Sequence, residues 1–218
     1  MTEKTALIVG SSGAVGRHIL RLLLESDNYQ KVISLVRRPS GVTHGKLVER
    51  IVDFDSLTSF TLNERVNHVY CSLGTTRKRA GSAEGFRKVD LDYVLALGEW
   101  SKCCGAERFG VISSIGAGQK GRGLYLQTKT EMEQGLKELD FSSLLIFRPS
   151  LLHGERDEFR LGEQLGYWGL KGMSWLPGLQ QYQPVATETV ARVMVEYVSR
   201  SHVEGLEVVE GLAFHETT

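Results

Sequence analysis

The chain has 218 residues, and its 26 Lys and Arg balance 26 Asp and Glu to give a formal net charge of zero. This length suits one well-buried domain and is short for two. Without net charge, no overall field attracts the chain to nucleic acid or an anionic membrane, and no apolar run is long enough to span a bilayer. Three cysteines fit a reducing compartment. We therefore expect a cytoplasmic protein with no nucleic acid and no membrane as partners.

The first predicted strand leads into a glycine-rich turn. Thr5–Val9 is an apolar run typical of a strand buried on both faces, and helical spacing of apolar residues follows from Ala14 to Glu25. The turn between them reads Gly10-Ser11-Ser12-Gly13-Ala14-Val15-Gly16. Its glycines allow a tight turn, a close approach of pyrophosphate to the main chain and close packing of helix on strand. With the N–H groups of the helix N-terminus, this segment predicts a dinucleotide-binding site.

The second predicted strand, Lys31–Val36, ends at Arg37 and Arg38. In a dinucleotide-binding fold the tip of this strand faces the adenosine ribose, where an acidic residue binds a free 2′-hydroxyl and an arginine pairs with a 2′-phosphate. Because no Asp or Glu lies near this tip, NADP(H) is preferred over NAD(H). Two exposed arginines before a turn are the alternative interpretation.

The third predicted strand, Leu47–Val52, is followed by acidic residues. Asp53 is a candidate acceptor for the adenine amino group. Alternatively, Asp53 is only a turn residue, and Asp55 caps the following helix.

A possible proton-transfer site follows the fifth predicted strand. Phe109–Ile112 is apolar and ends in Ser113-Ser114, and a helix is predicted over Leu124–Leu139. Tyr125 and Lys129 lie four residues apart on this helix and therefore project from one face. Chance alone often produces a Tyr-x-x-x-Lys pattern, so its position after the strand is what makes it informative.

These residue types suit hydride transfer to a carbonyl. A lysine ammonium beside a phenol favours phenolate, so Tyr125 can exchange a proton. A serine hydroxyl can orient the carbonyl and stabilise the developing oxyanion. We prefer Ser114 for this role; Ser113 is the competitor, and one of the two can instead bond main-chain groups.

Alternation of strands and helices predicts an α/β fold with a doubly wound, mostly parallel sheet (a Rossmann fold) over residues 1–218. Residues 150–218 are expected to form a small C-terminal lobe of the same domain on the substrate side. In this part, the aromatic segment Leu161–Leu179 is expected either to cover the cleft or to pack on the core or on a second subunit. Thr187–Ser199 predicts a capped helix, and Val203–Val209 predicts a strand. The histidines show no paired helical spacing and no Cys-x-x-Cys partner, so no metal site is expected.

The chain resembles the short-chain dehydrogenases/reductases, with the glycine spacing of their extended and atypical branches. Within that superfamily it resembles more closely the atypical members that include the human Tat-interacting oxidoreductase-like protein and bacterial relatives. The resemblance covers most of the chain, to about residue 185, and is carried by the glycine turn and by residues 52–54, 71–77, 85–90, 93–94, 113–114, 125–129 and 147–149. The strings Leu73-Gly74-Thr75-Thr76-Arg77 and Tyr125-Leu126-Gln127-Thr128-Lys129 are its most specific parts.

The resemblance implies further cofactor contacts. Asp53 and Phe54 would lie on the adenine side, Leu73 and Gly74 would line the cleft, and Thr75 would begin the loop beyond. Lys129 would also bind the nicotinamide ribose, and the backbone of Arg148-Pro149-Ser150-Leu151 would meet the carboxamide. Where the superfamily often has asparagine, this chain has Asp90 or Asp92, which leaves the proton relay of that helix open.

The sequence thus predicts an NADP(H)-dependent oxidoreductase that transfers hydride to or from a small carbonyl-type substrate by a Ser-Tyr-Lys mechanism. The alternative is a protein that binds NADP(H) as a redox sensor or regulator without significant turnover. Substrate and reaction direction are not encoded in these motifs, and a homodimer is possible.

Overall fold

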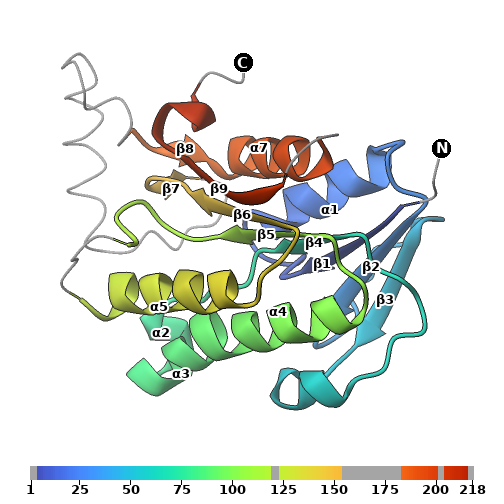
Figure 1. Ribbon diagram of the computed structural model, residues 1–218, viewed down its shortest axis with the longest axis horizontal. Helices are drawn as coiled ribbons and strands as arrows, with labels where there is room; N and C mark the ends of the chain where they lie inside the picture. The colour runs from blue at the N-terminus through green and yellow to red at the C-terminus, as the bar shows by residue number, and fades with distance from the viewer. Residues whose placement is uncertain (1–3, 119–122, 154–182, 201–203, 216–218) are drawn as a thin grey trace.

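The computed structural model describes residues 4–118, 123–153, 183–200 and 204–215. Its main sheet has seven strands in the order β3-β2-β1-β4-β5-β6-β9, and all neighbouring strands run parallel (Figure 1). The strands are β1 (Thr5–Val9), β2 (Lys31–Val36), β3 (Leu47–Ile51), β4 (His68–Cys71), β5 (Arg108–Ile112), β6 (Ser143–Arg148) and β9 (Gly205–Glu210). Two short strands, β7 (Leu152–His153) and β8 (Val185–Ala186), pair separately.

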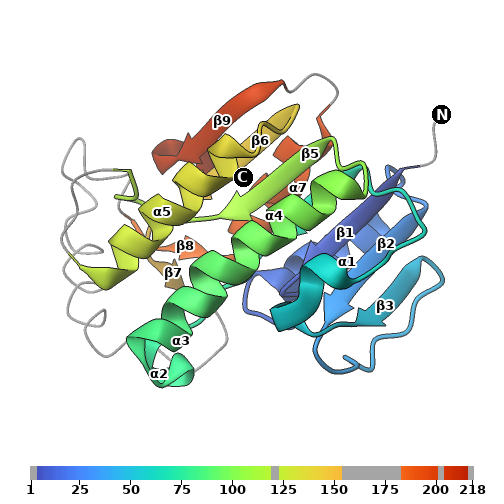
Figure 2. The same ribbon diagram turned by 60° about the horizontal axis from the view of Figure 1, so that its bottom comes forward.

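Helices cover both faces of the sheet. Helices α1 (Gly16–Glu25) and α7 (Thr187–Ser199) lie on one face, and α4 (Tyr93–Cys103) and α5 (Leu124–Glu138) lie on the other (Figures 1 and 2). The shorter helical segments are η1 (Phe54–Ser59), α2 (Arg77–Ala80), α3 (Ala83–Arg87), the π-helical turn η2 (Lys88–Asp92) and η4 (Gly211–Phe214). This three-layer arrangement confirms the predicted doubly wound α/β class.

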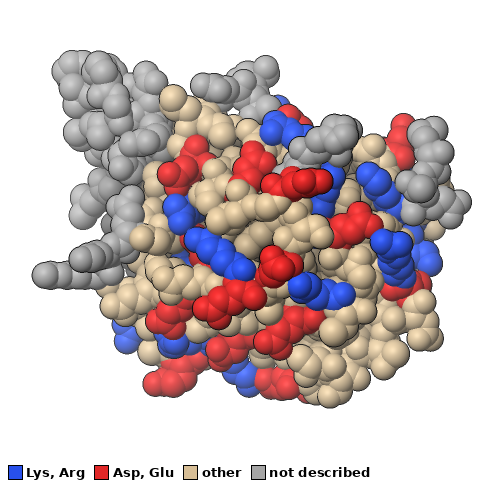
Figure 3. Space-filling view, in the orientation of Figure 1, with Lys and Arg blue, Asp and Glu red and all other residues tan. Residues whose placement is uncertain are grey.

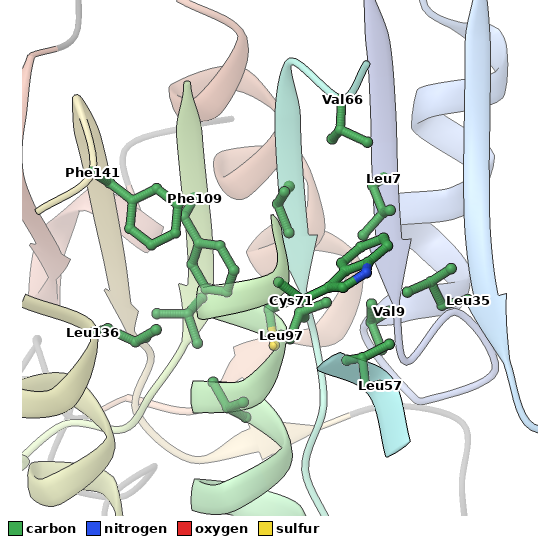
Figure 4. Packing of buried hydrophobic residues seen from close by; sticks show 14 of the residues in the cluster. Leu7, Val9, Leu35, Leu57, Val66, Cys71, Leu97, Phe109, Leu136 and Phe141 are labelled. Carbon is green, nitrogen blue, oxygen red and sulfur yellow. The ribbon is translucent and has the colours of Figure 1, made fainter. Parts of the chain in front are cut away.

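The central strands are apolar on both faces because each face meets a helical layer. In β1, Leu7 and Val9 join the core under α4 and α5, shown in Figure 4, whereas Ala6 and Ile8 join the core under α1 and α7. All four are fully buried. This explains why β1 appears in the sequence as an uninterrupted apolar run instead of an alternating one.

Predicted boundaries agree with the structure to within two residues where both are described. Helix α1 begins at Gly16 rather than Ala14, because the preceding residues belong to the turn. The prediction of a capped α7 is wrong in one respect: Ala186 precedes the helix without a side-chain capping bond, since β8 leads directly into it. Within α7, Val198 is buried in the core and Tyr197 is half-buried.

The described residues of the C-terminal region complete the main body of the domain. Strand β9 extends the sheet beside β6, and α7 packs against α1. The predicted aromatic segment Leu161–Leu179 lies outside the described residues. The lobe expected over residues 150–218 is therefore built, where described, as part of the three-layer domain.

Strand β1 is the point at which the chain switches from building one side of the sheet to building the other. From β1, the chain proceeds to β2 and β3 on one side and to β4, β5 and β6 on the other. In open parallel sheets, ligands bind at the carboxyl ends of the strands beside such a switch point. The topology therefore places the candidate site above the ends of β1 and β4.

Candidate active site

A cavity of about 640 Å3 opens at the carboxyl ends of β1, β4, β5 and β6. This size is typical of small-molecule sites. Most of its lining comes from five segments: the glycine turn, the loops after β4, β5 and β6, and the first turns of α5. The lining residues are Gly13, Ala14, Val15, Ser72, Leu73, Gly74, Thr75, Thr76, Arg79, Asp90, Ile112, Ser113, Ser114, Ile115, Tyr125, Leu126, Lys129, Pro149, Ser150, Leu151, Leu152 and Thr187.

The glycine turn is folded so tightly that side chains are excluded. Gly10 has a φ of 84°, and a Cβ there would lie 2.7 Å from the main-chain oxygen of Ser72. A Cβ on Gly16 would lie 2.0 Å from the oxygen of Gly10. Gly13 donates its N–H to the Gly10 oxygen at 2.8 Å and lines the cavity. The turn thus exposes main chain beside the start of α1, which is the arrangement that a pyrophosphate requires.

Tyr125 and Lys129 enter the cavity from the first two turns of α5. The Tyr125 side chain is half-buried, and its ring lies 5.9 Å from that of Phe86, measured between centroids. Its phenol is therefore part of the cavity wall and not of the hydrophobic core. Lys129 lies one turn deeper and is 4% exposed.

Asp90 forms an ion pair with Lys129 inside the cavity wall. Oδ1 of Asp90 lies 2.9 Å from Nζ of Lys129, and Oδ2 accepts a 2.8 Å hydrogen bond from the N–H of Thr75. Burial, the largest single influence, favours the neutral lysine, but the charge and hydrogen bond of Asp90 together with the nearby Tyr125 and Cys71 outweigh it, and the pKa of Lys129 lies above its ordinary value. Of the two aspartates considered from sequence, Asp90 lines the site and Asp92 is exposed.

Asp90 is a site residue that sequence reasoning left unassigned. It lies in η2, a single π-helical turn between α3 and α4, and such turns are frequent at functional sites. The available signal was an acidic residue between Val89 and Leu91, at a position where an apolar residue would continue the stripe of a buried helix.

The two candidate serines have different surroundings. Ser113 is 3% exposed and donates a 2.6 Å hydrogen bond to Oε1 of Glu133. Ser114 is more exposed, and its hydroxyl makes only a long 3.4 Å contact with the Ile115 oxygen. Both line the cavity, but only the Ser114 hydroxyl has no short partner among the described residues.

The side chain of Arg148 is engaged away from the cavity, so the contact predicted for this residue with the cofactor concerns its backbone alone and stays a prediction. It is the last residue of β6, and its Nη2 and Nε lie 2.6 and 2.9 Å from the carboxylate of Glu133. Its Nη1 also lies 3.1 Å from Glu210. The cavity wall at this point is made by Pro149, Ser150 and Leu151, as expected, without Arg148.

Four residues of the glycine turn lie outside the cavity wall. Gly10 and Gly16 shape the turn from behind, and Ser12 is exposed. Ser11 is buried and accepts a 2.9 Å hydrogen bond from Ser34 of β2, so its hydroxyl fastens the turn to the sheet.

The residues predicted to contact the adenosine half also lie beyond the cavity. Arg37 and Arg38 are exposed after the end of β2. Asp53 caps η1 by accepting a 3.0 Å bond from the N–H of Asp55, so the helix cap is Asp53 and not Asp55. Phe54 is buried in the core against Tyr93.

The described part of the chain adds three further facts. Positive and negative side chains are interspersed over the face shown in Figure 3. Among the described residues, no cluster of three His, Cys, Asp or Glu could hold a metal ion, and no helix has both the length and the apolar character to cross a membrane.

Comparisons with known proteins agree with this geometry. A model of the NAD dependent epimerase/dehydratase family matches residues 6–158. The chain is 35% identical to Protein HTATIP2 of Rattus norvegicus, covering 98% of this chain and 88% of that protein. It is 32% identical to Protein FMP52-1, mitochondrial, of Scheffersomyces stipitis, with coverage of 94% and 92%.

Solved structures share the fold at low sequence identity. MoeE5 in complex with UDP-glucuronic acid and NAD superposes with a TM-score of 0.72 at 19% identity, over 95% of this chain and 76% of that chain. A short-chain dehydrogenase/reductase superfamily protein from Agrobacterium tumefaciens with bound NAD gives 0.69 at 17% identity, over 95% and 77%.

Proposed function

The chain belongs to the NAD dependent epimerase/dehydratase family, as an atypical short-chain dehydrogenase/reductase, and on this premise we propose that it is an NADP(H)-dependent oxidoreductase. Its reaction is hydride transfer to or from a small carbonyl-type substrate. The observation that carries the proposal is the meeting of Tyr125, Lys129 and Ser114 on one cavity, beside a glycine turn that excludes side chains.

The glycine turn and the loop after β6 would hold a nicotinamide dinucleotide in this cavity, and that cofactor would supply or accept the hydride. During reduction, Tyr125 donates a proton to the carbonyl oxygen from the cavity wall. The ammonium of Lys129 stabilises the phenolate that remains. Ser114 donates a hydrogen bond to the same oxygen and so stabilises the negative charge that develops there. Pro149, Ser150 and Leu151 line the same cavity and would hold the nicotinamide ring there.

The preference for NADP(H) is supported by Arg37 and Arg38 after β2 and by the lack of an acidic residue at that tip. Their exposure leaves both guanidinium groups accessible to a 2′-phosphate. The solved structures named above contain NAD, so NAD(H) is the alternative that a direct comparison of the two cofactors must test.

The test is cofactor oxidation with a panel of aldehydes, ketones and quinones. We expect turnover by the natural sequence and a loss of at least about 10²-fold in kcat for Tyr125→Phe, because the proton donor is removed. Cofactor affinity, followed by NADPH fluorescence, should stay unchanged in this variant.

A different outcome of that assay supports a regulatory protein. If cofactor binds tightly and no carbonyl is reduced faster by the natural sequence than by Tyr125→Phe, the protein acts as an NADP(H) sensor. The buried ion pair of Lys129 with Asp90 is the observation that favours this alternative, since it offsets the charge available to Tyr125.

We also propose a small-molecule substrate, a possible homodimer and a cytoplasmic location. The fungal relative's name places that protein in mitochondria, so cell fractionation has to distinguish the two locations. Size-exclusion chromatography with light scattering tests the dimer.

A further inference from the structure

Lys129 is held by a carboxylate from another segment of the chain. Besides the 2.9 Å contact with Asp90, its Nζ donates a 3.4 Å bond to the main-chain oxygen of Ile112 at the end of β5. The side chains of Lys129 and Asp90 are only 5% and 2% exposed. Water and salt therefore screen this pair much less than a surface pair.

The same carboxylate fixes the loop after β4. While Oδ1 faces Lys129, Oδ2 accepts the N–H of Thr75. A Cβ on Gly74 would lie 3.5 Å from Oδ1, so the loop lies against the carboxylate. Both oxygens of Asp90 thus have defined partners, and one side-chain conformation serves the loop and the lysine together.

We propose that Asp90 is a positioning residue that keeps Lys129 charged and sets the pH range in which the Tyr125–Lys129 pair transfers a proton. This inference rests on the proposed function and concerns the same site. It adds a residue whose charge, and not only its shape, determines how the site works.

Three titratable groups act on Lys129, and they come from three elements. Asp90 lies on η2, Tyr125 on α5 itself and Cys71 at the end of β4. Burial raises the pKa of the Cys71 thiol to about 12, so Cys71 carries no charge near neutral pH. The phenol of Tyr125 is neutral before it reacts. Among these groups, Asp90 is therefore the one that opposes the lysine charge.

The expected direction of the effect follows from coupling. Tyr125 acts electrostatically on Lys129, so a pH profile of the reaction reports the first proton that leaves the site, whichever group releases it. A negative charge beside the pair makes that loss harder. Reduction needs a protonated phenol and a charged lysine, so its rate declines on the alkaline side, where the first of these protons is lost. Without the Asp90 charge, this alkaline decline must begin at a lower pH. One unit charge at this range shifts such a midpoint by about one pH unit.

Asp90→Asn tests the proposal because it removes the charge and keeps the size and an oxygen for the Thr75 N–H. Its matched control is Asp92→Asn, which removes the same charge from an exposed position two residues away. Rates of carbonyl reduction at saturating NADPH are measured against pH. We expect the alkaline decline to move down by about one unit in Asp90→Asn and to stay in place in Asp92→Asn. An unshifted profile in folded Asp90→Asn overturns the proposal.

A second measurement uses the unaltered protein, because loss of one partner of a buried pair can prevent folding. Lysine side-chain resonances are titrated by NMR, and Lys129 is assigned by its absence in Lys129→Arg. We expect the pKa of Lys129 to lie above that of an ordinary, exposed lysine in the same spectrum; a pKa below that of the exposed lysines overturns the proposal. This readout needs no turnover, so it stands even if the proposed enzyme is inactive. Conversely, if turnover depends on Tyr125 but the pH profile of Asp90→Asn is unshifted, only the role proposed for Asp90 is rejected, and the proposed oxidoreductase function stands.

Discussion

The hydroxyl of Ser113 donates a 2.6 Å hydrogen bond to the carboxylate of Glu133, which is 1% exposed and also receives two bonds from Arg148. Glu133 lies one turn beyond Lys129 on α5. The contact therefore ties the end of β5, which carries both serines, to the helix that carries Tyr125 and Lys129. It leaves Ser114 as the serine whose hydroxyl is available to a substrate.

The two serines should respond differently to substitution. Ser114→Ala should lower kcat by about 10²-fold, because an oxyanion donor is lost. Ser113→Ala should leave kcat nearly unchanged and lower the free energy of unfolding by about 1–3 kcal/mol, because a buried carboxylate loses a donor. Steady-state kinetics and chemical denaturation measure the two effects. A larger fall in kcat for Ser113→Ala would assign the catalytic role to Ser113.

Arg37→Ala and Arg38→Ala test the choice of cofactor. If either guanidinium binds the 2′-phosphate, its loss should raise the Kd for NADPH about tenfold or more, the size of one charge-assisted hydrogen bond. The Kd for NADH should hardly change, because NADH lacks that phosphate. Fluorescence titration with both cofactors gives the comparison, and equal losses would reject the phosphate-binding role.

Gly16→Ala should destabilise the fold, because the added Cβ would lie 2.0 Å from the main-chain oxygen of Gly10. Moving α1 away from β1 to relieve this overlap should cost about 2 kcal/mol or more. Gly45→Ala is the control, since its Cβ would meet no atom within 4 Å. Its free energy of unfolding should change by about 0.5 kcal/mol at most. Similar losses in both variants would contradict the packing argument.

His68 should make stability depend on pH. Its Nδ1 lies 2.7 Å from the hydroxyl of Tyr29, and burial, followed by the charge of Arg108, lowers the pKa of His68 to about 3. In the unfolded chain the pKa is near 6.5, so between these values the unfolded state binds the additional proton. The contribution of neutral His68 is therefore complete above about pH 6.5 and decreases by about 1.4 kcal/mol per pH unit as the pH falls towards 3.

Chemical denaturation between these pH values measures this slope. His68→Gln should reduce it, because the titrating ring is gone. His44→Gln removes an exposed histidine and should leave the slope as it is. An equal slope in the natural sequence and in His68→Gln would show that other groups control the acid sensitivity.

The strands and the glycine turn could be predicted because they depend on local patterns. Thr5–Val9 and Lys31–Val36 are apolar without alternation, and this indicates strands covered on both faces. The turn after β1 needs glycines because its main chain approaches Ser72 and itself too closely for side chains. The same reasoning placed Tyr125 and Lys129 on one helix face.

The partners of individual polar side chains could not be predicted, because they come from distant segments. For Arg148, a backbone contact with the cofactor was expected, and the structure adds that its side chain pairs with Glu133, 15 residues earlier on α5. For Asp53, an adenine acceptor and a turn residue were both open, and the structure shows that its side chain caps η1. An exposed charge and a paired one look the same in a sequence.

The sequence by itself determined the α/β class, the parallel sheet, the glycine turn and the residues able to transfer a proton, because propensity, apolar periodicity and glycine geometry act over short stretches of chain. Only the tertiary structure decided which ionisable groups meet. Asp90 reaches Lys129, and Ser113 reaches Glu133, because η2, α5 and β5 converge at one end of the sheet. Burial there replaces water with specific partners, so the charge on each group depends on contacts that no local pattern encodes.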